Sequence, residues 1–174
     1  HDDYSWQAYW DNFQPYRGGH GSYWYRWSTK NEIEWKGNYR LWMRFINEYK
    51  NRGGRVCAGS DSGFIFQLFG FGFVRELEML QEAGFHPLEV IRAASLEGAH
   101  LLGIEADCGS LEVGKRADLL VHDQNPLEDF KLLYGTGAMR LNDDSRRVEW
   151  QRGLSRTIAG GICYDTAELL ADVR

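Results

Sequence analysis

Asp61 is the residue of this sequence best placed for chemistry. It lies in the stretch GGRVCAGSDSGF, between two serines and ahead of a glycine, where a short apolar run gives way to a loop. In α/β proteins, functional side chains gather where parallel strands end at their carboxyl side. A carboxylate at that point can bind a metal ion or act as a general base. Aspartate also commonly caps a helix or closes an Asx turn, so the local sequence leaves both interpretations open.

The residues before Asp61 predict the elements that would position it. Six of them recur at the spacing of one helix face: Trp35, Tyr39, Trp42, Met43, Ile46 and Tyr49. The pair Gly53–Gly54 is typical of the end of a helix. Between Arg55 and Gly59 the residues are continuously apolar rather than alternating, which predicts a strand covered on both faces. A helix, a strand and a loop in this order form one unit of an α/β protein.

Short helices are predicted after the glycine-broken run FIFQLFGFGF, whose phenylalanines either seal a site from water or belong to the core. One helix covers Val74–Ala83, a second has Pro87 in its first turn, and a third covers Ala99–Leu102, because glycines follow the first and the third. His86 and His100 lie at these helices, away from the predicted strand end. We therefore expect both histidines to have structural or surface roles rather than to bind a metal.

The remaining residues predict antiparallel strands and a final helix. Leu111–Val121 has alternating apolar residues around a Gly-Lys turn and is typical of a β-hairpin. Arg140–Ser145 is a polar turn, and Thr157–Tyr164 predicts the last hairpin around two glycines. Asp165 or Thr166 would then cap the terminal helix.

Four blocks, in the same order along the chain, resemble the amidohydrolase superfamily, the metal-dependent hydrolases related to imidazolonepropionase and dihydroorotase. The blocks are AGSDSG, ELEMLQEAGFHPLEVIRAAS, LLGIEADCGSLEVGKRADLLVHDQNPLEDF and RTIAGGICYDTAELLADVR. AGSDSG is similar to the aspartate motif that follows the eighth barrel strand of this family. The resemblance extends from about Trp35 to Arg174.

This resemblance implies an α/β fold, made of the carboxyl-terminal part of a (β/α)8 TIM-like barrel and a small β-sandwich domain. Residues 1–104 would form the last barrel strands and helices, and residues 105–174 the β-domain. It also implies that Asp61 serves as metal ligand and general base. A metal-activated water would hydrolyse a C–N bond of an amide, a cyclic amide or a dipeptide, and the expected cofactor is a divalent metal, zinc in the first place.

Most metal ligands of such an enzyme cannot be placed in this chain. Related enzymes use an HxH pair, a carboxylated lysine or glutamate, and further histidines, whereas the five histidines here include no HxH. One aspartate cannot hold a catalytic zinc, which takes about three protein ligands. A complete barrel also needs about 250 residues. We therefore expect the carboxyl-terminal portion of a longer or two-chain enzyme, inactive alone, whose partner is the missing amino-terminal half of the barrel or a further copy of this chain. The start HDDYSWQ, without methionine, is typical of a truncated reading frame, a processed chain or a proteolytic product.

Aromatic residues are concentrated at the amino terminus, where six of the seven tryptophans fall within the first quarter of the chain. Residues 1–34 show no sustained period and predict a long loop, which by the family resemblance would follow the seventh barrel strand and cover the mouth of the barrel. Four of its residues would then contact substrate: Arg17, His20, Tyr23 and Trp24. The alternative is that the tryptophans only pack against other parts of the fold.

Composition excludes several other classes of protein. No apolar run approaches the ~20 residues of a membrane span. A net charge of -5 with scattered basic residues argues against binding to nucleic acid. Cys57, Cys108 and Cys163 are too widely spaced for a zinc knuckle and predict reduced, buried thiols. A small amide or dipeptide is the expected ligand. The remaining alternatives are an inactive or partner-dependent fragment and an aromatic-rich binding module, for example for carbohydrate.

Overall fold

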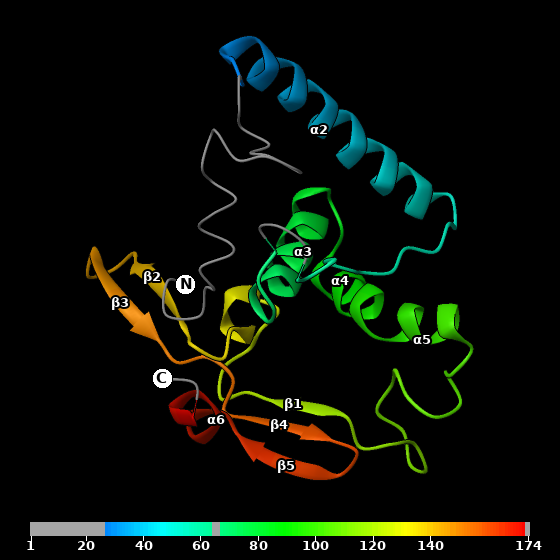
Figure 1. The fold of residues 1–174 in the computed structure, drawn as a ribbon, viewed down its shortest axis with the longest axis vertical. Helices are drawn as coiled ribbons and strands as arrows, with labels where there is room; N and C mark the ends of the chain where they lie inside the picture. Colours follow the sequence, from blue (N-terminus) through cyan, green and yellow to red (C-terminus); the bar gives the residue numbers. More distant parts are fainter. Residues whose placement is uncertain (1–26, 64–66, 173–174) are drawn as a thin grey trace, which may run out of the picture.

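A computed structural model describes residues 27–63 and 67–172 of the chain (Figure 1). The elements, in order, are α2 (Thr29–Asn51), α3 (Phe71–Glu82), α4 (Pro87–Ala94), α5 (Leu96–Leu102), β1 (Leu119–Val121), η2 (Phe130–Leu133), β2 (Ala138–Asn142), β3 (Arg147–Gln151), β4 (Arg156–Ala159), β5 (Ile162–Asp165) and α6 (Thr166–Asp172). Helices are gathered in the first part of the chain and strands in the second.

The long helix α2 confirms the helical period of its sequence. It begins after Ser28, whose side chain accepts a hydrogen bond from the backbone of Asn31 while the Asn31 side chain accepts one from the Ser28 backbone. Gly53, with a φ of 85°, ends the helix in a left-handed conformation that favours glycine. The expectation that the loop extends to residue 34 is wrong for residues 29–34, because this capping box starts the helix earlier.

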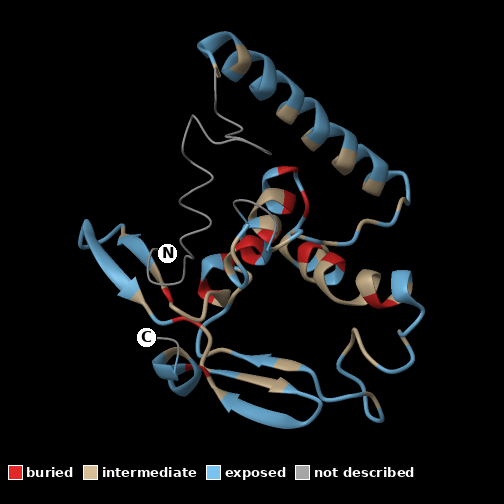
Figure 2. Ribbon diagram, in the orientation of Figure 1, coloured by how far each residue is buried: buried red, intermediate tan, exposed pale blue. Residues whose placement is uncertain are grey.

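The core lies where α3 and α4 pack on each other and on η2. Its buried side chains come from successive turns of α3, from α4 and from Phe130, which is 2% exposed. Pro87 occupies the first turn of α4, as its missing N–H allows, and the Nδ1 atom of His86 accepts the N–H of Leu88 as a cap. Gly103 ends α5 in the left-handed region. In Figure 2 the buried residues gather in this central part of the molecule.

The strands form two separate antiparallel sheets. One has the order β1-β4-β5, and the other pairs β2 with β3. The predicted hairpin Thr157–Tyr164 is confirmed by β4 and β5, and Asp165 caps α6 by accepting the N–H of Ala167 at 2.9 Å. The predicted hairpin Leu111–Val121 is wrong. Its second half, β1, pairs with β4 far along the chain, while Leu111 is 80% exposed and outside any described strand.

The predicted strand Arg55–Gly59 is wrong as well. A strand needs a neighbouring strand to take up its backbone groups, and the one backbone hydrogen bond described for this segment joins Ala58 N–H to the carbonyl of Ala93 in α4, at 3.0 Å. The segment is extended, and Cys57 is exposed rather than buried. Cys163 is also exposed, because it lies on β5 at the edge of its sheet.

Helix α2 lies apart from the core along most of its length (Figure 1). None of its residues is buried. The partly covered side chains that face the core include Met43 and Ile46. A barrel and a sandwich remain predictions, because the described residues form neither a closed sheet nor two sheets packed face to face. Among these residues, no helix combines the length and the apolar character needed to cross a membrane.

Candidate functional site

Asp61 lies in the turn between the extended segment and α3. Its φ of 48° places it in the left-handed region, where few residues other than glycine are found but where aspartate is among those tolerated. The residue is exposed. Within residues 27–63 and 67–172, no side chain or backbone group donates a hydrogen bond to its carboxylate. Among the described residues, the carboxylate thus has no hydrogen-bond donor, and the left-handed backbone places it in a tight turn.

The residues on either side of Asp61 hold its backbone in place. The hydroxyl oxygens of Ser60 and Ser62 lie 2.7 Å apart in a hydrogen bond beneath it. The N–H of Gly63 donates to the carbonyl of Gln67 at 2.8 Å, which closes the loop. Both serines are partly covered, while Asp61 between them is exposed.

The start of α3 supports this loop from below. A Cβ atom at Gly72 would come within 2.9 Å of the Ser62 hydroxyl and of the Gln67 side-chain oxygen. Gly72 is buried, so an added Cβ there would force the Ser62 and Gln67 side chains to move. Sequence analysis gave no role to Ser60, Ser62 or Gly72. The signal that could have found them is the serine on each side of the aspartate, followed by glycine in an otherwise bulky aromatic run.

The described residues do not complete a metal site. Among residues 27–63 and 67–172, no three histidine, cysteine, aspartate or glutamate side chains come together. His86 is occupied as a helix cap, and His100 lies 3.6 Å from Glu105. Both placements agree with the structural roles expected for these histidines. Asp61 can supply one oxygen ligand.

The four predicted substrate contacts, Arg17, His20, Tyr23 and Trp24, lie outside the described residues. Their position relative to Asp61 is therefore not tested. They stay predictions.

Among the ionisable groups whose pKa is shifted by their surroundings, Glu76 and Tyr39 lie on the two helices next to the Asp61 loop. Burial raises the pKa of the Glu76 carboxyl on α3 above its ordinary value. Burial, together with a hydrogen bond to Glu82 of 2.6 Å, raises the pKa of Tyr39 to about 12. Tyr39 lies on α2 and Glu82 at the end of α3, so this bond ties the long helix to the core.

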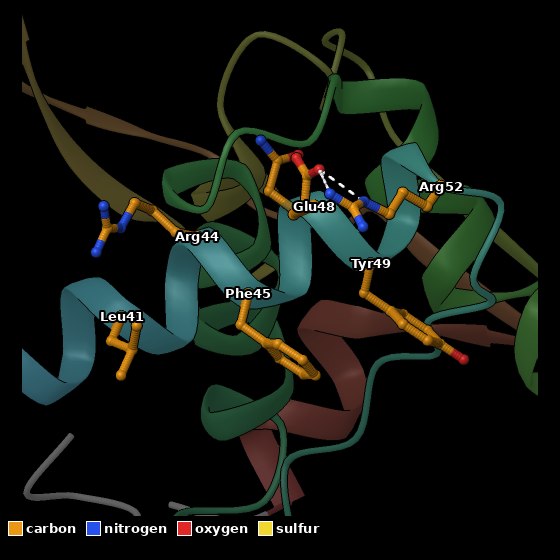
Figure 3. Close-up of a pocket in the computed structure, with 7 residues that line it drawn as sticks. Leu41, Arg44, Phe45, Glu48, Tyr49 and Arg52 are labelled. Carbon is orange, nitrogen blue, oxygen red and sulfur yellow. Dashed lines mark hydrogen bonds and ion pairs between the residues drawn. The ribbon is translucent and has the colours of Figure 1, made fainter.

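A depression of the described surface, with a volume of about 690 Å³, lies on α2 rather than at Asp61 (Figure 3). Leu41, Phe45 and Tyr49 line it on one side, and the ion pair Glu48–Arg52 borders it at 2.7 Å. All its lining residues come from one helix and the residue that follows it, whereas small-molecule sites are usually enclosed by several elements. It is therefore an open depression along one helix rather than an enclosed ligand cavity.

Comparison with known proteins identifies the family. The family model "Amidohydrolase family" matches residues 42–142, more than half of the chain, and the matched part includes Asp61 and its supporting helix. The chain belongs to the amidohydrolase family. This confirms the resemblance found in the sequence.

Individual amidohydrolases match shorter parts of the chain. A 5'-deoxyadenosine deaminase of Methanobrevibacter smithii is 35% identical over 70 residues, which are 40% of this chain and 16% of that protein. An imidazolonepropionase of Bdellovibrio bacteriovorus is 40% identical over 65 residues, which are 37% of this chain and 14% of that protein. The matched regions are therefore about one sixth of the length of these relatives.

Two solved structures share the fold of this chain. A Xaa-Pro dipeptidase with bound methionine matches with a TM-score of 0.55 and 27% identity, over 72% of this chain and 25% of that one. A Bifidobacterium longum protein classed provisionally as a prolidase matches with a TM-score of 0.54 and 33% identity, over 75% of this chain and 29% of that one. The arrangement of helices and strands is thus that of one part of a larger amidohydrolase.

Proposed function

We propose that this chain forms part of an enzyme that hydrolyses C–N bonds, with Asp61 as metal ligand and general base. The observation that supports this most directly is the exposed carboxylate of Asp61, held on a left-handed backbone and free of hydrogen bonds from the described residues. Asp118, by contrast, has a structural role and accepts the N–H of Gly160 at 2.8 Å.

A divalent metal fits this chain only in part, because Asp61 is one ligand and the described residues offer no others beside it. The remaining ligands would come from barrel strands outside this chain. When bound, a metal such as zinc would polarise the substrate carbonyl and lower the pKa of water. The part that falls to this chain is proton transfer: Asp61 takes a proton from the attacking water and passes it to the leaving nitrogen.

A dipeptide is the substrate that we favour over a simple or cyclic amide. The two solved structures that share the fold over more than 70% of this chain are a dipeptidase and a prolidase-type protein. We retain Arg17, His20, Tyr23 and Trp24 as proposed substrate contacts, His20 by hydrogen bonding or proton transfer and the aromatic rings as walls of the pocket.

The rest of the barrel is the proposed partner, whether it belongs to the same polypeptide or to a second one. Two features support this. The large apolar side chains of α2 that face away from the core are 50% to 67% exposed, for example Phe45 and Tyr49. The extended segment after α2 leaves its backbone groups without a neighbouring strand. Barrel strands would cover the apolar face of α2 and would pair with the extended segment after it.

The test is Asp61→Asn in the enzyme that contains the complete barrel, measured with a panel of dipeptides, cyclic amides and simple amides. We expect kcat to fall by about 10²–10⁴-fold, as for loss of a general base, and metal content to fall with it. Asp143→Asn is the matched control, since Asp143 is exposed in the turn between β2 and β3. Unchanged kcat in Asp61→Asn would contradict the proposal. Activity on cyclic amides alone would contradict the dipeptide assignment.

A further inference from the structure

Ser62, the residue after Asp61, is bonded to both sides of the turn that carries the aspartate. Its hydroxyl oxygen lies 2.7 Å from that of Ser60, the residue before Asp61. The same hydroxyl donates to the carbonyl of Leu68 in a longer bond of 3.5 Å. The Ser62 side chain is partly covered, whereas Asp61 is exposed. Ser62 therefore joins the turn at Asp61 to the residues just before α3.

These two bonds fix the direction in which the serine protons point. A serine hydroxyl has one proton to donate, and a carbonyl oxygen can only accept. The proton of Ser62 is directed at Leu68, so in the bond between the two serines Ser60 is the donor. Both protons are thus used to hold the turn. Neither serine donates to the Asp61 carboxylate, which has no donor among residues 27–63 and 67–172.

The carbonyl of Leu68 also receives the first backbone bonds of α3. It accepts the N–H of Phe71 at 3.3 Å and the N–H of Gly72 at 2.8 Å. Ser62 is therefore bonded to the same oxygen as the first turn of the helix. Functional groups supported by helices and strands are held more precisely than groups on loops alone. Through Ser62, the turn at Asp61 gains such support.

The turn needs support because its backbone is unusual. Asp61 has a φ of 48° and Gly63 a φ of 94°, so two residues out of three are left-handed. For residues other than glycine this conformation costs free energy. It persists where the surrounding contacts leave the backbone no alternative. Ser62 lies between these two residues, and its side chain supplies such contacts.

We propose that Ser62 is a positioning residue for Asp61. The inference rests on the proposed function, because it takes Asp61 as the carboxylate that binds the metal and transfers the proton. Ser62 acts on the turn rather than on the substrate. Its bonds to Ser60 and Leu68 hold the conformation that leaves the Asp61 carboxylate exposed and without a donor. Loss of a group that orients a metal ligand usually lowers metal affinity or activity by about 10–100-fold.

The first test is amide hydrogen exchange in the enzyme that contains the complete barrel, without added metal or substrate. The N–H of Gly63 donates to the carbonyl of Gln67 at 2.8 Å and reports whether the loop is closed. Ser62→Ala should speed its exchange at least tenfold. Ser95→Ala is the matched control, because Ser95 is also partly covered and donates to a carbonyl, that of Ile91 at 2.7 Å, but between α4 and α5. It should leave the exchange of Gly63 unchanged.

The second test is the kinetics of the same variants. Ser62→Ala should lower kcat about 10–100-fold and leave KM unchanged, whereas Ser95→Ala should change neither. In an Asp61→Asn background, Ser62→Ala should lower kcat no further, because a residue that acts through Asp61 has no effect once Asp61 is disabled. Ser62→Cys keeps the size and a weak donor. It should recover part of kcat, and it serves if the alanine variant fails to fold.

Unchanged kcat in Ser62→Ala would overturn the proposal even if Gly63 exchanged faster, because the contact would then be only structural. Unchanged exchange of Gly63 would overturn it too. So would an equal fall of kcat in the wild-type and Asp61→Asn backgrounds, since Ser62 would then act independently of Asp61. Full kcat in Asp61→Asn alone would be a different failure, that of the proposed function, and this inference would fall with it.

Discussion

At the scale of single residues, the site depends on a close contact between a loop and a helix. Asp61 keeps its left-handed backbone because the serines beside it are bonded to each other and because the loop lies against the buried Gly72. The pair of serines is thus part of the support of the proposed catalytic carboxylate. This contact can be tested without knowing the substrate.

Gly72→Ala should destabilise the chain by about 1–3 kcal/mol, the usual effect of overpacking. Its added methyl group would come within 2.9 Å of the Ser62 hydroxyl. Gly98→Ala is the matched control, because Gly98 lies inside α5 with no atom within 4 Å of an added Cβ. It should stabilise by about 0.5–1 kcal/mol, the helix preference of alanine over glycine. Urea denaturation checks both, and equal effects of the two substitutions would show that Gly72 is not a contact position.

Glu76 should make stability depend on pH. Burial raises its pKa in the folded state, so its contribution to stability is present at low pH and is lost as pH rises above the unfolded value of 4.5 through the folded pKa. Glu76→Gln should therefore raise the free energy of unfolding at pH 7, modestly because the side chain is half-exposed. The gain should vanish near pH 4.

The matched control for this substitution is Glu78→Gln. The Glu78 carboxylate lies 3.7 Å from the Lys131 ammonium. Neutralising Glu78 should therefore lower rather than raise the free energy of unfolding of the chain. A Glu76→Gln variant less stable than the wild type at pH 7 would mean that its carboxylate has a favourable partner.

At the scale of elements, α2 is attached to the core by few contacts. Met43 and Ile46 of the helix contact the core, while its wider apolar face stays open. The bond from the Tyr39 hydroxyl to Glu82 and the ion pair of Lys50 with Glu89, at 2.6 Å, fix the two ends of this contact.

Tyr39→Phe should lower stability by about 0.5–1.5 kcal/mol near neutral pH, the usual value of one hydrogen bond. The pKa of Tyr39 is raised to about 12 in the folded state from 10.0. Its stabilising effect is therefore complete below pH 10 and is lost as pH rises toward 12, because a phenolate cannot donate to Glu82. The difference between wild type and variant should close over that range in thermal unfolding experiments. Tyr49→Phe, on the open face, should behave as wild type, and a persistent difference at pH 12 would contradict the assignment.

At the scale of the whole molecule, the covered and the open apolar surfaces predict different responses to substitution. Leu77 is 1% exposed at the centre of the core, and Phe45 is 58% exposed on α2. The core forms from α3, α4 and η2 within this chain. The open face of α2 would become a core only when further barrel strands are present.

Leu77→Ala should cost about 2–5 kcal/mol in this chain, as for other buried leucines. Phe45→Gln should change its stability by less than about 0.5 kcal/mol. In the enzyme with the complete barrel, Phe45→Gln should become destabilising by about 1–3 kcal/mol as the ring is buried. Thermal unfolding of both forms measures this difference. No added effect in the complete enzyme would show that the open face of α2 is not the barrel contact.

The sequence by itself determined the elements whose signals are local. The helical period of α2, Pro87 at the start of α4, the glycine turn between β4 and β5 and the cap of α6 are all fixed by neighbouring residues, and each was predicted correctly. The Ser28 capping box is equally local, but it was missed. Family membership was also predicted, because it rests on ordered motifs rather than on packing.

Tertiary structure alone decided which segments became strands. A strand exists only where a second one takes up its backbone groups. Arg55–Gly59 has the composition of a buried strand but no described neighbour, and Leu119–Val121 pairs with β4 instead of with the residues just before it. The same holds at the site. Sequence singled out Asp61, whereas the fold showed that Ser60, Ser62 and Gly72 hold its loop, because their contacts arise only when the loop and α3 come together.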